Sequence, residues 1–87
     1  MQLQKIRYFL ILCDELNFTR AAKRSAISQP SLTASIRSFE KMCGGALFLR
    51  KPSVRLSPLG IAIRSNCEKI SREFDRLLAT ARAHHRR

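Results

Sequence analysis

Residues 29–43 carry two unlike sets of side chains at helical spacing, and one set has a chemistry suited to binding. At 100° per residue, one stripe contains only small and cationic residues: Pro30, Thr33, Ala34, Arg37 and Lys41. Small residues let another surface approach closely, and the cations attract a negatively charged one. Taken alone, the stripe fits an ordinary solvent-exposed helix face equally well.

The residues that flank this stripe indicate where its helix begins and ends. Ser28 is a favourable N-cap, Pro30 lies in the first turn where no N–H is required, and Gly44 permits a left-handed stop. These signals predict a helix from Gln29 to about Cys43. The opposite stripe is apolar and should be buried; it contains Leu32, Ile36 and Phe39.

Two further helices are expected before this one. Apolar residues recur at steps of three and four over residues 3–15, which predicts an amphipathic helix. Asn17 or Thr19 can cap a second helix over residues 18–25, in which Ala21 and Ala22 permit close helix packing. A short turn links it to the helix at 29–43, so the pair is predicted to form a helix-turn-helix whose second helix is the reader.

After Gly44 the pattern changes to a hairpin and then to a long helix. Alternating apolar residues around the basic turn "RKPS" predict a wing over about residues 47–56. Ser57 and Pro58 then open a helix that continues into the eighties. Its apolar positions alternate steps of four and three, which favours a dimer interface; they are Ile63, Cys67, Ile70, Phe74, Leu77 and Ala81.

The composition indicates a polyanionic partner. The 87 residues include 17 Lys+Arg against 6 Asp+Glu, a net charge of +11 with neutral histidines. Nucleic acid and an anionic membrane surface are the candidates. The basic residues are interleaved with apolar ones, which is typical of a folded surface rather than a disordered arm.

Several function classes are disfavoured. The three cysteines, Cys13, Cys43 and Cys67, are far apart in apolar contexts, so neither a disulfide framework nor a zinc site is expected, and we interpret them as reduced thiols. A redox sensor would need an exposed thiol of low pKa.

No signal peptide or membrane-length apolar run is present, so neither secretion nor membrane insertion is expected. Catalytic motifs, cofactor loops and metal-ligand clusters are also missing from the sequence, so an enzyme is not expected; His84 and His85 lie in a polar tail.

The stretch "FTRAAKRSAISQPSLTASIRSFEKMCGGALFLR" followed by "VRLSPLG" resembles the N-terminal DNA-binding domain of LysR-type transcriptional regulators. The likeness covers nearly the whole chain. Matching positions include the opening "LQKIRYFL", Ala21-Ala22, Ser28-Gln29-Pro30, Leu32, Ile36, Glu40, Gly44, Leu47-Phe48, Arg50, Leu56-Ser57 and Gly60.

The resemblance implies a mostly α winged helix-turn-helix over residues 1–57 and a linker helix over 58–87 that pairs two protomers. It implies promoter or operator DNA as the partner, a cytoplasmic bacterial protein at the nucleoid, and no cofactor. A small-molecule effector would bind only a C-terminal domain outside this chain. Ala34 stands where the family commonly has Arg, and the wing is about one residue shorter, with "KPS" where members often carry a minor-groove Arg.

Each interface residue can then be given a role. Gln29 can pair with adenine, and Pro30, the Thr33 methyl group and Ala34 can pack against thymine methyls, which predicts an A·T-leaning half-site. The expected base readers are Gln29, Pro30, Ser31, Thr33 and Ala34. The expected backbone contacts are Thr19, Arg20, Ser28, Arg37, Lys41 and Arg50, and those of the wing at the minor groove are Lys51, Ser53 and Arg55.

Two rival interpretations stay open at this point. A basic helical module could bind RNA or a ribosomal surface, although the few aromatic residues fall mostly at core spacing. The long helix could instead make the chain a protein-binding adaptor. The operator sequence, the regulated genes and the direction of regulation do not follow from the sequence.

Overall fold

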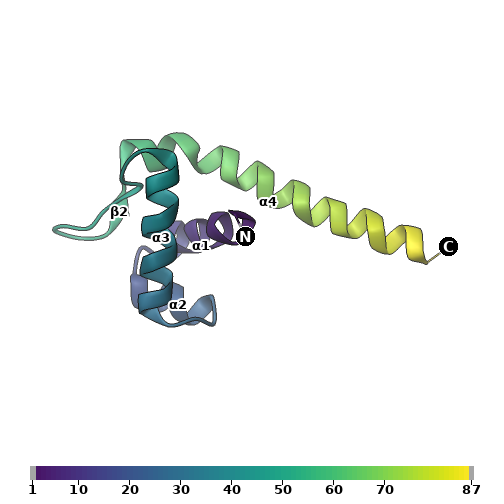
Figure 1. Cartoon of the computed structure of the whole chain (residues 1–87), viewed down its shortest axis with the longest axis horizontal. Helices are drawn as coiled ribbons and strands as arrows, with labels where there is room; N and C mark the ends of the chain where they lie inside the picture. The colour runs from purple at the N-terminus through teal and green to yellow at the C-terminus, as the bar shows by residue number, and fades with distance from the viewer. Residues whose placement is uncertain (1, 87) are drawn as a thin grey trace.

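The computed structural model describes residues 2–86 and contains four helices and a two-stranded sheet. α1 (Gln2–Glu15), α2 (Phe18–Arg24) and α3 (Gln29–Cys43) form a three-helix body. β1 (Phe48–Leu49) and β2 (Arg55–Leu56) form a hairpin that projects from it, and α4 (Pro58–His85) crosses the body and runs well beyond it (Figure 1). The molecule is therefore elongated, 54 × 26 × 19 Å, and confirms the predicted winged helix-turn-helix with a long C-terminal helix.

Polar side chains at the helix starts explain where three helices begin. In each case a side-chain oxygen accepts an amide N–H three residues on: Asn17 from Arg20 (2.8 Å), Ser28 from Ser31 (3.2 Å) and Ser57 from Gly60 (3.0 Å). Asn17, rather than Thr19, is therefore the cap of α2. α3 ends at Gly44, whose φ of +84° is the left-handed conformation that glycine adopts without strain.

The core lies where α1, α3 and the hairpin meet. The ring of Phe9 contacts those of Phe39 and Phe48, with centroids 5.7 and 5.5 Å away. Fully buried aliphatic side chains surround this trio: Leu12, Leu32, Ile36 and Leu47. These contacts bury the apolar stripe of α3 as expected and leave its small and cationic stripe facing outward.

The turn between α2 and α3 places a residue with a Cβ in the left-handed region. Ala26 has φ +58°, a conformation that costs roughly 1–2 kcal/mol for a residue other than glycine. Two backbone hydrogen bonds hold it there, from the Ala26 amide to the Lys23 carbonyl and from the Ile27 amide to the Ala22 carbonyl, both at 3.1 Å. The turn thereby fixes the angle between α2 and α3.

The first half of α4 belongs to the core. A Cβ at Gly60 would lie against the backbone carbonyl of Leu47, so only glycine allows this close approach. Further along, Cys67 is 4% exposed within the single chain, and Ile63 packs against the same core. The first half of α4 therefore packs on the same core as the three-helix body.

Part of the predicted dimer seam already packs within the single chain. Cys67 is covered by the chain's own core, and Ile63 is half-buried against the same core. Phe74 is also engaged within the chain, since the Arg7 guanidinium lies 5.3 Å from its ring and binds Asp75 at 2.9 Å. Of the six predicted seam residues, Ile70, Leu77 and Ala81 are exposed.

Candidate nucleic-acid interface

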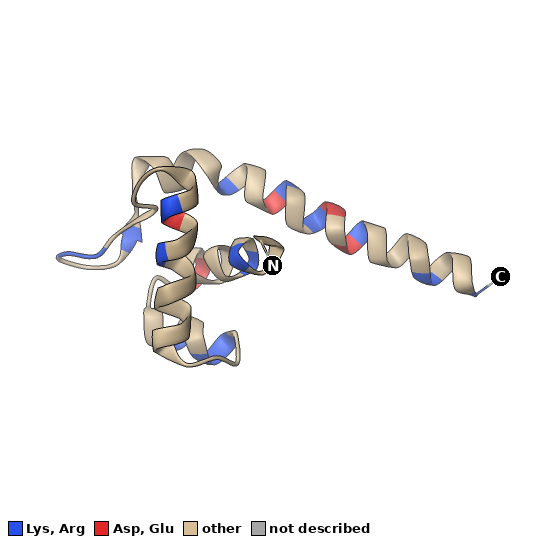
Figure 2. Ribbon diagram, viewed as in Figure 1, with Lys and Arg blue, Asp and Glu red and all other residues tan. Residues whose placement is uncertain are grey.

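The outward stripe of α3 presents the residues expected to read DNA. Thr33 is half-buried, and the rest of the stripe is exposed: Pro30, Ala34, Arg37 and Lys41, together with Gln29 and Ser31 at the helix start. Figure 2 shows basic positions on α3, on the wing and on α2. The helix thus offers small side chains at its first turns and cations further along.

The start of α3 is fixed by its own cap. The Ser28 hydroxyl accepts the Ser31 amide and donates to the Ser31 hydroxyl oxygen at 2.8 Å. The Ser31 hydroxyl can therefore donate outward while its oxygen is held in place. The amides of this first turn also carry the positive end of the helix dipole, which favours an anion.

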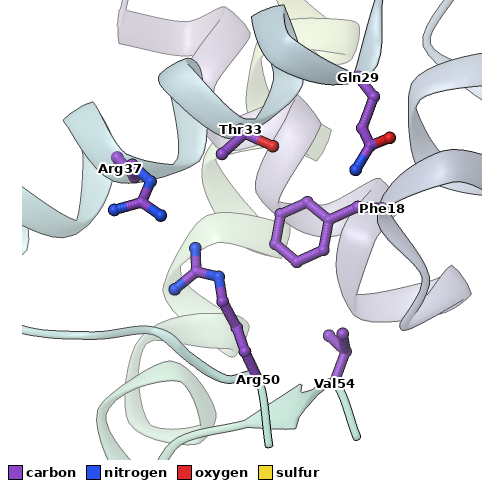
Figure 3. A pocket seen from close by; sticks show the side chains of 6 residues that line it. All are labelled: Phe18, Gln29, Thr33, Arg37, Arg50 and Val54. Atoms are coloured by element: carbon purple, nitrogen blue, oxygen red, sulfur yellow. The ribbon is translucent and has the colours of Figure 1, made fainter.

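A hollow of about 240 Å³ lies between α3 and the wing. Its lining comes from α2, α3 and the wing loop: Phe18, Gln29, Thr33, Arg37, Arg50 and Val54. Figure 3 shows the guanidinium groups of Arg37 and Arg50 on the same side of this space and the Phe18 ring near its centre. The sequence predicted DNA contacts for Gln29, Thr33, Arg37 and Arg50 but gave no reason to place Phe18 or Val54 beside them.

Glu40 fixes the wing to α3. One carboxylate oxygen accepts the amides of Leu47 (2.8 Å) and Phe48 (3.3 Å), and the other accepts Nη2 of Arg50 at 3.4 Å. The Glu40 side chain is only 12% exposed. In the sequence, Glu40 stands out only as a matching position of the family; its one local signal is that it is the single acid on an otherwise neutral and basic helix.

Arg50 is held in a defined orientation rather than extended into solvent. Besides its ion pair with Glu40, its guanidinium carbon lies 5.2 Å from the centroid of the Phe18 ring. The side chain remains 33% exposed, so it can still reach a ligand in the hollow.

The wing is braced by an arginine. β1 and β2 pair antiparallel, with Phe48 opposite Leu56 and Leu49 opposite Arg55. Nη1 of Arg55 donates to the carbonyls of Lys51 (2.8 Å) and Ser53 (3.1 Å), which closes the loop over its own side chain. The side chains of Lys51 and Ser53 are exposed at the tip, whereas Arg55 has a structural role that its sequence position did not reveal.

Acids at the end of α1 contact the basic residues of α2. Nε of Arg20 lies 3.3 Å from Glu15, and Nη1 of Arg24 lies 3.3 Å from both Asp14 and Glu15. Because these pairs are largely exposed, each stabilises the fold little and can be exchanged for another anion. Thr19, the other backbone contact expected on α2, is exposed.

The cysteines and histidines show no reactive or metal-binding arrangement. Burial raises the pKa of the Cys13 thiol to about 12, and burial also raises the pKa values of Cys43 and Cys67, so all three stay protonated at neutral pH. Among residues 2–86 no group of three or more His, Cys, Asp or Glu side chains could hold a metal ion. Over the same span, no helix is long and apolar enough to cross a membrane.

Comparison with known proteins identifies a family and its architecture. Residues 3–61 match the sequence profile described as "bacterial regulatory helix-turn-helix protein, lysR family". The chain is 40% identical over 83 residues to the HTH-type transcriptional regulator BudR of Klebsiella aerogenes, covering 94% of this chain and 58% of BudR. It is 42% identical over 60 residues to the HTH-type transcriptional regulator CatR of Pseudomonas putida, covering 69% of this chain and 21% of CatR.

A solved structure agrees over the full length of both chains. The crystal structure of the BenM DNA-binding domain in complex with catB site 1 DNA superposes with a TM-score of 0.91 at 28% identity, covering 98% of this chain and 97% of that one. The chain spans only part of the length of the curated relatives, 58% of BudR and 21% of CatR.

Proposed function

Because the chain belongs to the lysR family of bacterial regulatory helix-turn-helix proteins, we propose that it binds a specific double-stranded operator as a dimer and so regulates transcription. The family consists of regulators, not enzymes, and its relatives here are named as such. The observation that carries the proposal is the outward stripe of α3, which presents exposed small side chains beside cations.

α3 is the element proposed to enter the major groove. Gln29 at its exposed tip has the donor and acceptor needed for the major-groove edge of adenine. Pro30, Ala34 and the Thr33 methyl group are small enough to pack against thymine methyl groups, and Ser31 can donate a hydrogen bond. An A·T-leaning half-site follows from this set of side chains.

Backbone contacts supply most of the affinity in this proposal. Arg37 and Lys41 are exposed on α3, and Thr19 and Arg20 are exposed on α2. With Arg50 and the capped amides at Ser28, they would fix the register of the protein on the duplex without reading sequence. The exposed wing tip, Lys51 and Ser53, is proposed to lie at the adjacent minor groove, with Arg55 holding its shape.

Dimerisation is proposed to use the part of α4 that the body does not cover. Ile70 is 48% and Leu77 is 58% exposed, one heptad apart on the same side of the helix. Together with Ala81 and the outer edge of Phe74 they form an apolar stripe. Two protomers joined there would present two copies of α3, so the operator should be an interrupted palindrome.

A DNA-binding regulator of this kind would act in the cytoplasm at the nucleoid. Any small-molecule effector would bind outside this chain, in the part of the relatives' length that it does not span.

Selection of bound duplexes from a random DNA pool at moderate salt tests the proposal. Enrichment of an A·T-leaning palindrome with half-sites about one helical turn apart is the expected result. Tight, salt-sensitive binding without any enriched sequence would contradict it and favour a partner that is held by its backbone alone, such as RNA.

A further inference from the structure

The hollow between α3 and the wing has the composition of an anion site. Two guanidinium groups, from Arg37 and Arg50, line it together with the hydroxyl of Thr33, while Phe18 and Val54 supply an apolar wall. Guanidinium groups match the oxygens of a phosphate with two parallel donors each. No carboxylate is among the six residues that line the hollow.

The position of the hollow suggests which anion it receives. If α3 enters a major groove and the wing meets the next minor groove, the sugar-phosphate strand that separates the two grooves must pass between these elements. The hollow lies between the same two elements, since its lining comes from α3 and the wing loop, with Phe18 of α2 (Figure 3). We infer that it seats one phosphodiester of that strand, with the adjoining deoxyribose against Phe18 and Val54; this inference rests on the proposed DNA-binding function.

The proposed phosphate site in the hollow, called the seat below, is preorganised in the protein without DNA. Stacking on Phe18 at 5.2 Å and the 3.4 Å ion pair with Glu40 restrict the Arg50 side chain, so less rotamer entropy is lost when it binds a phosphate. Arg37 approaches from α3 (Figure 3). The phosphate is thus held by one cation from each of the two elements that flank it.

Glu40 acts here as a positioning residue. Its carboxylate accepts the Leu47 and Phe48 amides at 2.8 and 3.3 Å, which sets the distance between α3 and the base of the wing. Because these amides and Arg50 surround its oxygens, its charge is largely neutralised within the protein. Gln29, at the edge of the hollow nearest the helix tip, keeps its role as a base reader.

Methylphosphonate scanning tests the seat. In the selected duplex, each phosphate of one half-site is replaced in turn by a neutral methylphosphonate, and binding is measured for the wild-type chain, Arg50→Gln and Arg37→Gln. At one position the replacement should weaken wild-type binding about tenfold yet weaken neither variant further, because the same contact has already been lost. At every other position, the fold-loss of affinity from the methylphosphonate and the fold-loss from the arginine substitution should multiply.

Further variants separate the seat from general charge and from folding. Arg72→Gln removes the same charge on exposed α4 and should lose affinity equally at all positions of the scan. Arg50→Lys should keep the salt dependence of wild type but bind more weakly, since lysine lacks the two parallel N–H donors of a guanidinium group. Glu40→Gln should select the same DNA sequence as wild type. In the Glu40→Gln background, however, Arg50→Gln and the methylphosphonate at the seat should deviate less from multiplicative losses of affinity. Thermal melts of each variant check folding, and Arg37→Gln, at an exposed site, gives an answer even if Arg50→Gln unfolds.

Two results overturn the inference, and they are distinguishable. If the loss of affinity from each substitution and the loss from each methylphosphonate multiply at every position, the hollow binds no phosphate, although the chain still reads DNA. If the wild-type chain selects no sequence at all, the proposed function fails and the seat fails with it.

Discussion

Replacing Glu40 with alanine tests how strongly one carboxylate joins the wing to α3. The side chain is 12% exposed and accepts the Leu47 amide at 2.8 Å, the Phe48 amide at 3.3 Å and the Arg50 guanidinium at 3.4 Å. A hydrogen bond to a charged group contributes about 1.5–3 kcal/mol, and a buried amide left without a partner costs about 1–3 kcal/mol.

The three contacts are not equally strong. The 2.8 Å bond has nearly ideal length, the 3.3 Å bond is weaker, and the ion pair with Arg50, which is 33% exposed, contributes less than about 1 kcal/mol after screening by solvent. We therefore expect Glu40→Ala to lower the free energy of unfolding by about 3 kcal/mol. For a domain of this size, such a loss corresponds to a fall in Tm of roughly 12–24 °C.

Urea unfolding followed by circular dichroism measures this change, and Glu73→Ala is the matched control. Glu73 lies on α4, is 71% exposed and pairs with Arg76 at 3.7 Å, so its removal should change stability by less than about 0.5 kcal/mol. Amide exchange adds a local readout, because the Leu47 and Phe48 amides should exchange faster in Glu40→Ala. A loss no larger than that of the control would refute the assignment of Glu40 as the link between α3 and the wing.

Four further substitutions or conditions give definite expectations. Gln29→Ala should lose about 1–3 kcal/mol of discrimination between selected and scrambled duplexes; an equal loss on both would mean that Gln29 is not a reader. Gly60→Ala should destabilise the chain by about 1–3 kcal/mol in urea unfolding, although alanine is the better helix former, because its Cβ would meet the Leu47 carbonyl; a neutral result would mean that the backbone can shift there. Burial raises the pKa of Cys13 from 9.0 to about 12, so the unfolded chain loses this proton first and the free energy of unfolding should fall as the pH rises from about 9 to about 12. Cys13→Ala should show a shallower fall over that window, and an unchanged slope would assign it to other groups. Leu77→Glu should shift the chain to monomer in analytical ultracentrifugation, whereas a dimer that persists would place the interface elsewhere.

Features set by a few neighbouring residues were predictable from the sequence. The caps of α3 and α4, Ser28 and Ser57, are recognised within one turn of helix, as is the glycine stop at Gly44. The resemblance to LysR-type regulators is confirmed by the match over residues 3–61. The winged helix-turn-helix class follows because its elements are short and each has a strong local signal.

Features that depend on how elements meet were not predictable in the same way. The contact of Glu40 with Leu47 and Phe48 exists only because the chain folds back after Gly44, and no helical or strand period records it. Phe18 was predicted only as the first residue of a helix, although its ring lies beside Arg50. A period of three and four along α4 likewise cannot tell burial in the chain's own core, as at Cys67, from burial by a partner.

The basic residues of the proposed interface divide into two groups with different physical roles. Arg20, Arg50 and Arg55 each bind an acid or a carbonyl of the same chain. On DNA they would exchange or share these partners, so their Coulomb gain is smaller than the charge suggests, but their orientation is fixed in advance. Arg37, Lys41 and Lys51 are exposed and would supply most of the salt-dependent attraction. A chain with a net charge of +11 is attracted to any duplex, so the proposed selectivity must come from the base readers at the start of α3, which the held arginines help to position.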